Sequence, residues 1–247
     1  MDYSKTIEKV KDSIALVVTL NPQGAITGKG SGFVFYKKGL LVTCNHVVAN
    51  EDNIKIRLLD GSTDFIDAKV TIRDEEHDLA LLKYDESKAP NSNPLLQIKQ
   101  SGIKEGMPVL FAGYPLGLFN LTSHQGILSG ILKDQTGMTT YMIDGTVNSG
   151  NSGCPLMDAN GCVIGVVNAK RRERSDLLSQ VEKLQIGALS LHGIDLVELH
   201  QALISNVQLG MGYAVPCSYI PSYKDSGGIQ SVVGSDEVKS VVKKKKK

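Results

Sequence analysis

The stretch LLVTCNHVV, residues 40–48, is a short apolar run that leads directly into a histidine. Apolar runs of similar length recur along the chain, separated by glycine and other turn residues. Short strands at this spacing are typical of an all-β barrel or sandwich. We expect strands at 14–20, 32–36, 40–43, 53–58, 68–72, 79–84, 108–112, 126–132, 139–143, 162–168 and 212–216.

Two β units fit this pattern. Residues 88–101 are rich in proline, asparagine and serine, which indicates a linker. The tetrapeptide Asp158-Ala-Asn-Gly161 predicts a hairpin turn in the second unit. We expect a helix at 4–12 and the following division: 1–95 with the first unit, 96–222 with the second, and a flexible basic tail at 223–247.

Residues 170–209 interrupt the β pattern. Apolar residues share one helix face at Leu177, Val181, Leu184 and Ala188. Asp195 and Glu198 resemble the capping box of a second helix. We expect a helical hairpin inserted between two strands, which is either a lid, a partner-docking element or oligomer contact, or a passive surface elaboration.

The net charge of +1 depends on five terminal lysines, residues 243–247. The rest of the chain carries 22 basic and 26 acidic residues. This balance excludes a disordered chain and a strongly basic nucleic-acid module, so no specific nucleic-acid partner is expected. The lysine run is either a solubility tail or an attachment to an acidic surface.

No apolar stretch reaches the roughly 18 residues that a membrane helix needs. Residues 1–13 contain no secretory apolar core, so we expect no membrane span and a cytoplasmic location. The cysteines contain no close pair of the kind that zinc sites use, and thiols rather than disulfides are expected. No metal or other cofactor is predicted. The four cysteines are Cys44, Cys154, Cys162 and Cys217.

A glycine-rich loop, VNSGNSGCPL at 147–156, contains the candidate nucleophile Ser152. Glycines on both sides let the backbone turn sharply and aim consecutive N–H groups at one point, as an oxyanion hole requires. The other interpretation is a polar loop without a catalytic role. An α/β-hydrolase elbow is excluded, because Cys154 stands where that motif has glycine.

A serine nucleophile needs a base and a carboxylate that orients the base. His46 is the histidine that directly ends an apolar strand. The other four, His77, His124, His192 and His200, are expected at exposed positions or on helix surfaces. Asp78 opens the apolar run DLALLK. The order His46, Asp78, Ser152 along the chain makes the set specific.

Successive sequence blocks resemble, in order, those of trypsin-like serine proteases of the Deg/HtrA type. The resemblance extends from about residue 7 to residue 220 and implies two six-stranded antiparallel β-barrels of the chymotrypsin fold, with the active site between them. The blocks are GSGFVF (30–35) with LLVTCNHVV, HDLALLKY (77–84), FAGYPLG (111–117) with HQGILSG (124–130), GNSGCPL (150–156), GCVIGVVNA (161–169) and GMGYAVP (210–216).

The resemblance also assigns roles to residues. Ser152 would be the nucleophile, His46 the general base and then acid, and Asp78 the residue that fixes the imidazole tautomer. The N–H groups of Gly150 and Ser152 would form the oxyanion hole, which rotation of residues 149–151 would dismantle. The implied function is a regulated serine endopeptidase that acts on unfolded or partner-presented proteins.

Two cysteines depart from the family pattern. Cys154 replaces a usual glycine, and Cys44 replaces a small or polar residue two positions before His46. They are either inert packing or a redox-sensitive site. A catalytically silent pseudoprotease that binds proteins is the alternative function. A cysteine protease is excluded, because Cys154 lies two positions past the nucleophile.

The primary specificity pocket follows from the same resemblance. Because no carboxylate stands at its base, we expect a small or medium aliphatic residue on the acyl side of the cleaved bond. Lys170 and Arg171 near the rim could instead attract an acidic side chain. The implied base is Thr146, and the implied walls are Asn168 and Ala169 on one strand and Gly210 to Gly212 on the other.

The expected partner is a protein or peptide substrate. A regulatory protein could bind the helices expected at 170–209. We expect no PDZ module after residue 220, although many Deg proteins carry one. The helix at 4–12 is the feature closest to the family's oligomer-forming region, so a homo-oligomer stays open.

Overall fold

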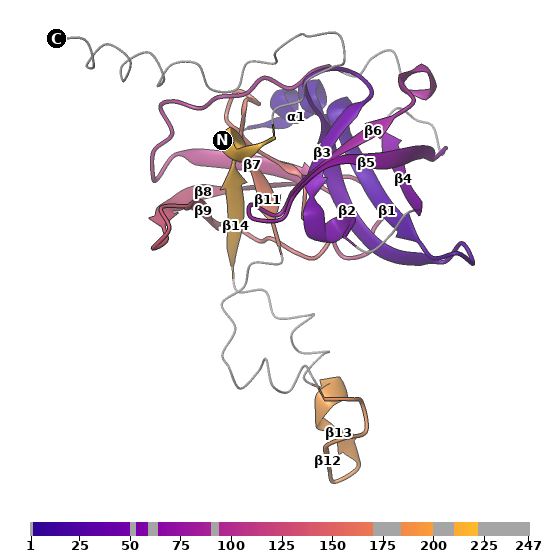
Figure 1. Ribbon diagram of the computed structural model, residues 1–247. Coiled ribbons are helices and arrows are strands. Elements are labelled where there is room, and N and C mark those ends of the chain that lie inside the picture. The colour runs from indigo at the N-terminus through magenta and orange to yellow at the C-terminus, as the bar shows by residue number, and fades with distance from the viewer. Residues whose placement is uncertain are drawn as a thin grey trace, which may run out of the picture.

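The computed structural model describes residues 2–49, 53–58, 64–89, 94–169, 184–199 and 210–221. Its strands form two closed, antiparallel, six-stranded barrels, which confirms the predicted fold class. Figure 1 shows the first barrel in indigo to purple beside the second barrel in magenta to orange.

The first barrel consists of β1 (Ile14–Leu20), β2 (Ile26–Val34), β3 (Leu40–Cys44), β4 (Asn53–Leu58), β5 (Ile66–Asp74) and β6 (Leu79–Tyr84). The strand order is β1-β2-β3-β6-β5-β4, and pairing of β4 with β1 closes the barrel. β1 and β3 are buried along nearly their whole length. Burial on both faces explains why their sequences are continuous apolar runs instead of alternating ones.

The second barrel consists of β7 (Pro108–Gly113), β8 (Thr122–Lys133), β9 (Thr139–Asp144), β10 (Pro155–Asp158), β11 (Val163–Asn168) and β14 (Met211–Pro216). Pairing of β7 with β10 closes it. On β7, Val109 and Phe111 belong to the core inside this barrel, whereas Leu110 and Ala112 belong to a core that continues into the first barrel. Since alternate side chains of a strand point to opposite faces, the two barrels pack on each other through apolar side chains.

All eleven strands expected from the sequence are present. The largest differences are longer N-terminal ends of β2 and β8. Pairing with β1 overrides the low strand propensity of glycine in β2, and pairing with β7 extends β8 over the polar residues 122–125. The remaining barrel strand, β10, ends at the predicted hairpin turn. Asp158 Oδ1 stabilises this turn by accepting the N–H groups of Asn160 and Cys162.

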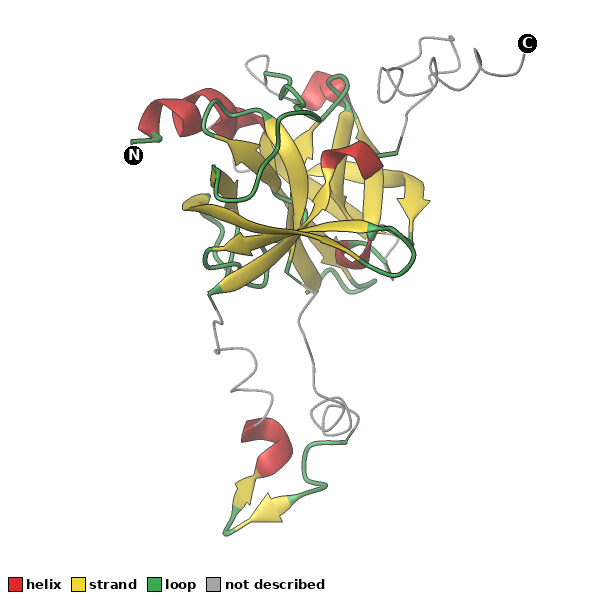
Figure 2. Cartoon of the chain, turned by 90° about the vertical axis from the view of Figure 1, so that its left-hand side faces the viewer, coloured by secondary structure: helices red, strands yellow, loops and turns green. Residues whose placement is uncertain are grey.

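Helical segments in the described ranges are short and lie next to the ends of strands (Figure 2). The expected N-terminal helix is present as α1 (Ser4–Val10), and Thr6 Oγ1 donates a hydrogen bond to the Ala159 carbonyl of the β10–β11 turn. The 3₁₀ turns are Lys11–Ser13, Asn45–Val47, Glu86–Lys88 and Cys217–Tyr219. Among the described residues, no helix has the length and hydropathy to span a membrane.

Most of the predicted helical hairpin, residues 170–183 and 200–209, lies outside the described residues. A helix through Leu184 and Ala188 is a wrong prediction, since residues 184–195 form turns and a hairpin of β12 (Ser190–Leu191) and β13 (Ile194–Asp195). Gly187 and Gly193 have positive φ angles there, and this turn chemistry outweighs the helical spacing of apolar residues.

The predicted start of the second helix is present. Residues 196–199 are helical. Asp195 Oδ1 accepts the N–H groups of Val197 at 2.8 Å and Glu198 at 3.0 Å, as expected of an N-cap residue.

Candidate active site

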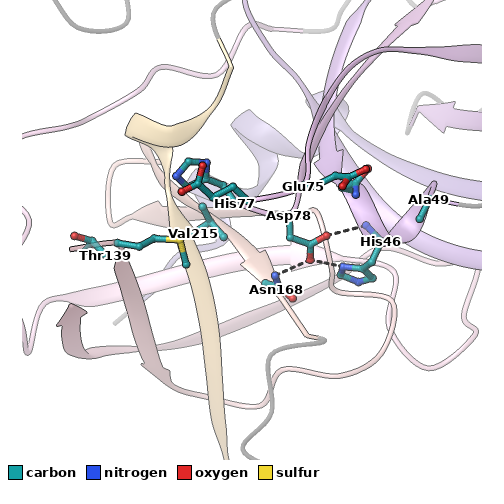
Figure 3. Close-up of a pocket in the computed structure, with 11 residues that line it drawn as sticks. His46, Ala49, Glu75, His77, Asp78, Thr139, Asn168 and Val215 are labelled. Atoms are coloured by element: carbon teal, nitrogen blue, oxygen red, sulfur yellow. Dashed lines mark hydrogen bonds and ion pairs between the residues drawn. The ribbon is translucent and has the colours of Figure 1, made fainter. Parts of the chain in front are cut away.

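The three residues predicted as a triad come together in the structure. His46 Nδ1 lies 2.5 Å from Asp78 Oδ2, and His46 Nε2 lies 3.0 Å from Ser152 Oγ. Figure 3 shows the Asp78 carboxylate between the His46 ring and the Asn168 amide. His46 and Asp78 come from the first barrel and Ser152 from the second, so the set exists only where the barrels meet.

Strand pairing positions the first two residues. β3 pairs with β6 so that Cys44 lies opposite Leu79, which places the turn that follows β3 beside the residue that precedes β6. The N–H of His46 donates to Asp78 Oδ1 at 2.8 Å, and the N–H of Asn45 donates to the Asp78 carbonyl. Asp78 has a φ of 55°, a backbone conformation that residues other than glycine seldom adopt. The surrounding hydrogen bonds hold this residue in place.

The electrostatics keep the Asp78 carboxylate ionised. Burial raises its pKa, but the hydrogen bonds and charge of His46, together with the Asn168 amide at 2.9 Å, outweigh burial and leave the pKa below its ordinary value. An ionised carboxylate beside Nδ1 favours the tautomer in which Nδ1 carries the proton. Nε2 of His46 is then free to accept a proton.

A second hydrogen bond orients the hydroxyl of Ser152 as a donor to His46. The backbone N–H of Ala169 donates to Ser152 Oγ at 3.1 Å. Because Oγ accepts that hydrogen bond, its own proton is available for His46 Nε2.

Two peptide groups of the nucleophile loop, residues 149–154, point their N–H groups into open space. The Ser149 carbonyl accepts from the N–H of Leu116 at 2.8 Å, and in a trans peptide the N–H of Gly150 then points the opposite way. The carbonyl preceding Ser152 likewise accepts from the N–H of Cys154 at 3.0 Å. Among the described residues, neither the Gly150 nor the Ser152 N–H has an acceptor, and both residues line a cavity of about 440 Å³.

Glycine is required at two positions of this loop. Gly150 has a φ of +94°, and a Cβ there would lie 2.2 Å from the Tyr114 carbonyl oxygen. Gly153 has a φ of +90°, and a Cβ there would lie 2.1 Å from the Ser31 carbonyl oxygen. Both positions combine a left-handed backbone with close approach of another chain segment.

Ser31 on β2 holds the nucleophile loop from the opposite barrel, and sequence reasoning missed it. Its Oγ donates to the Gly150 carbonyl at 2.7 Å and accepts the N–H of Tyr114 at 3.0 Å, while its own N–H donates to the Ser152 carbonyl at 2.8 Å. Thr43 Oγ1 donates to the Ser31 carbonyl. The sequence signal for this role is a polar residue, Ser31, inside the apolar block GSGFVF. The structure buries it completely.

Comparison with known proteins identifies the family. Residues 30–166, more than half of the chain, match the family model for the trypsin-like peptidase domain. The chain belongs to the trypsin-like peptidase family. It is 33% identical over 176 residues to Protease Do-like 1, chloroplastic, of Arabidopsis thaliana, covering 68% of this chain and 38% of that protein. It is 32% identical over 194 residues to Serine protease Do-like HtrA of Lactobacillus helveticus, covering 74% and 46%.

Solved structures agree. An HtrA-type protease AlgW with tripeptide superposes with a TM-score of 0.64 at 27% identity, covering 88% of this chain and 60% of that one. Deg5 superposes with a TM-score of 0.58 at 28% identity, covering 67% and 83%. These matches confirm the resemblance to Deg/HtrA proteases. The chain spans less than half the length of the two curated relatives above.

The residues predicted to form the specificity pocket of this trypsin-like peptidase lie on neighbouring segments. Asn168 pairs with Tyr213 between β11 and β14, and the N–H of residue 145, just before Thr146, donates to the Gly210 carbonyl. A Cβ at Gly212 would lie 2.1 Å from the Val147 side chain, so these two positions are in close contact. The Asn168 side chain donates to Asp78, and Lys170 and Arg171 lie outside the described residues.

The two unusual cysteines of this peptidase are packing residues in the structure. Cys44 and Cys154 are fully buried, and burial raises the pKa of both thiols. Buried thiols with raised pKa values are poor nucleophiles, which favours inert packing over redox sensing.

One group of side chains in the described ranges has the donor types of a metal site. Donor atoms of Cys44, His46 and Asp78 lie within 4.8 Å of one another. A metal would need the Cys44 thiolate, which burial disfavours, and the Nδ1 lone pair of His46, which the hydrogen bond to Asp78 opposes. The arrangement suits proton transfer better than metal binding.

Two other histidines are less exposed than predicted. His77 lies 2.8 Å from Asp74 and stacks on Tyr219 with ring centroids 4.2 Å apart. His124 stacks on Phe111 with centroids 5.0 Å apart, and burial lowers its pKa. The prediction that these two histidines are exposed is wrong, because His77 packs on a residue far along the chain and His124 lies opposite Phe111 on the neighbouring strand β7.

Proposed function

We propose that the chain is a serine endopeptidase in which Ser152 is the nucleophile, His46 the general base and acid, and Asp78 the residue that orients the imidazole. The observation that carries the proposal is the continuous line of hydrogen bonds from Asp78 through His46 to the Ser152 hydroxyl. Membership of the trypsin-like peptidase family supports it.

In the proposed reaction, His46 Nε2 removes the Ser152 proton as Oγ attacks the substrate carbonyl. The Asp78 carboxylate stabilises the imidazolium that forms, and its lowered pKa keeps it ionised during this step. His46 then gives the proton to the leaving amine, and a water molecule activated by His46 hydrolyses the acyl-enzyme. The Ala169 N–H, which donates to Oγ in the resting site, favours the developing negative charge.

The oxyanion hole of the proposed enzyme consists of the N–H groups of Gly150 and Ser152. Their carbonyl counterparts in the same peptides are already bonded to protein N–H groups, so the donors need no rearrangement. One donor of this kind contributes about 3 kcal/mol to transition-state stabilisation.

Regulation is proposed to act on residues 149–151. The Asn151 side chain is fully buried, and neither its amide nitrogen nor its oxygen has a hydrogen-bond partner in the described part of the chain. An unpaired buried polar group costs about 1–3 kcal/mol. A substrate or partner that stabilises the ordered loop would therefore shift the population towards the active form. Unfolded or partner-presented proteins are the proposed substrates.

The proposed residue on the acyl side of the cleaved bond is small or medium and aliphatic. The contact between Val147 and Gly212 leaves little room between these segments, and Thr146 offers no carboxylate for a basic side chain. A partner site on residues 170–209, a homo-oligomer and a cytoplasmic location stay predictions. The silent pseudoprotease is not favoured, because it would not require a complete hydrogen-bonded triad.

A fluorophosphonate probe tests the proposal, since it reacts only with an activated serine. Wild type should label and Ser152→Ala should not. Ser101→Ala, which removes an exposed serine outside the site, is the control and should label like wild type. If wild type never labels, even with unfolded casein present, the endopeptidase proposal is wrong.

A further inference from the structure

Two cavities meet at His46. One, of about 430 Å³, is lined by Asp78 and Asn168 together with Glu75 and Glu76. The proposed function places Asn168 on the acyl side of the scissile bond, so this cavity belongs to that side. The other cavity, of about 440 Å³, is lined by the nucleophile loop and extends from it to β2 and the β7–β8 loop, which places it on the leaving-group side. It is lined by Thr27, Gly28, Lys29, His46, Val47, Gly117, Ser149, Gly150 and Ser152.

Two cations stand at the leaving-group side. The Lys29 ammonium donates to the Gly117 carbonyl and lies 3.7 Å from the centroid of the Phe119 ring. The Arg57 guanidinium donates to the Phe119 carbonyl and lies 5.7 Å from the centroid of the same ring. Lys29 and Arg57 therefore contact neutral carbonyl oxygens and an aromatic ring.

Neither cation has a carboxylate partner among the described residues, whereas Lys11, Lys55 and Lys99 each form an ion pair. Burial, followed by repulsion from Arg57, lowers the pKa of Lys29. An anionic group in the cavity would offset both effects.

The acyl-side cavity has the opposite character. Its lining includes the carboxylates of Glu75, Glu76 and Asp78 and contains neither lysine nor arginine. An acidic substrate side chain is repelled there and attracted on the other side of Ser152. The cleft therefore distinguishes the two directions of a charged peptide.

We propose that Lys29 is a specificity-determining residue that binds an acidic side chain, aspartate or glutamate, within the first two substrate positions after the scissile bond. This inference rests on the proposed endopeptidase function. Lys29 is held by Gly117 and Phe119 at the wall of the cavity that also contains Ser152, so a substrate carboxylate reaches its ammonium without displacing the catalytic residues. Arg57, behind the same aromatic ring, adds to the positive potential.

Quenched fluorescent peptides test the inference. The peptides share one acyl side and carry Glu, Gln or Lys at the first or second position after the cleaved bond. Wild type should cleave the Glu peptide with a kcat/KM about fivefold above the Gln peptide, and the Lys peptide more slowly still. Lys29→Met should remove the preference and Lys29→Glu should reverse it. Lys9→Glu makes the same charge change on exposed α1 and should keep the wild-type preference.

The ratio between peptides is measured within each variant, so it does not depend on the fraction of active protein. The preference should also shrink in 1 M NaCl, where the screening length falls to about 3 Å. Equal cleavage of all three peptides by wild type, or an unchanged preference in Lys29→Glu, would overturn the inference while leaving the endopeptidase proposal intact.

If no peptide is cleaved and wild type also fails to label with the fluorophosphonate probe, the endopeptidase proposal fails by itself. Binding of the same peptides to Ser152→Ala, followed by fluorescence anisotropy, then tests Lys29 separately. The Glu peptide should bind more tightly than the Gln peptide, and Lys29→Met should abolish the difference. Equal binding of the two peptides contradicts the inference.

Discussion

The two barrels build their halves of the site in different ways. The first barrel presents His46 and Asp78 at the ends of paired strands, and hydrogen bonds within that barrel hold both residues. The second barrel presents Ser152 on a glycine-rich loop whose carbonyls are held partly by Ser31 of the first barrel. The acid–base half is therefore set by strand pairing, whereas the nucleophile half depends on contact between barrels. The regulation proposed above would act on the second half.

The acid–base half is tested by Asp78→Asn. The amide nitrogen can hydrogen-bond His46 only in the other tautomer, which places the proton on Nε2 and prevents it from accepting the serine proton. We expect kcat to fall about 10⁴-fold with the fold retained. Peptidase assays with circular dichroism check this, and Asp74→Asn, which alters the similar pair with His77, is the control. Activity within tenfold of wild type would show that Asp78 does not orient the base.

The nucleophile half is tested by Gly150→Ala. The new Cβ would collide with the Tyr114 carbonyl and strain the left-handed backbone, so the peptide should rotate and withdraw an oxyanion donor. We expect kcat to fall about 10²- to 10³-fold. Gly106→Ala has a similar positive φ, +80°, with nothing within 4 Å of the new Cβ, and serves as the matched control. Equal effects of the two substitutions would mean that backbone strain alone explains the loss.

The link between the halves is tested by Ser31→Ala. Removing its hydroxyl leaves the Gly150 carbonyl and the Tyr114 N–H unpaired in a buried place, at a cost of about 1–3 kcal/mol in unfolding free energy. The freed loop should also lower kcat more than it changes KM, by about tenfold or more.

Ser129→Ala removes a serine hydrogen bond to the Met142 carbonyl within the second barrel and is the control for this experiment. Urea unfolding and steady-state kinetics measure both variants. If Ser31→Ala loses stability but keeps full kcat, the loop is not held in its active form by the first barrel.

The smallest expected effect is on acid stability. The pKa of Asp78 is lower in the folded than in the unfolded chain, so ionisation of this residue stabilises the fold. This contribution is fully present above the unfolded-state pKa of about 4. It is lost as the pH falls through the folded-state pKa of Asp78. The difference in unfolding free energy between wild type and Asp78→Asn should be constant from pH 7 to 5 and shrink towards pH 3. A difference that grows on acidification contradicts this assignment.

The sequence predicts the strands and the triad because both depend on local signals. Apolar runs bounded by turn residues mark the strands, and His46 and Asp78 each stand at the end of such a run. The expected helix through Leu184 and Ala188 fails because periodicity alone does not account for glycines with positive φ in the same segment.

The remaining features depend on contacts that no local signal reveals. Ser31 holds a loop more than a hundred residues away, and the Leu116 N–H fixes the direction of the Gly150 peptide. His77 finds Tyr219 across the chain. Such pairs become visible only when the barrels are assembled, because their energies arise from tertiary proximity.

Activation of Ser152 by His46 and Asp78 can be measured by mapping the fluorophosphonate adduct with mass spectrometry, with wild type, Asp78→Asn and Ser31→Ala compared at equal probe concentration. We expect an adduct on Ser152 in wild type that forms more slowly in Ser31→Ala and most slowly in Asp78→Asn. An adduct on another serine, or equal labelling rates in all three proteins, would show that His46 and Asp78 do not activate Ser152.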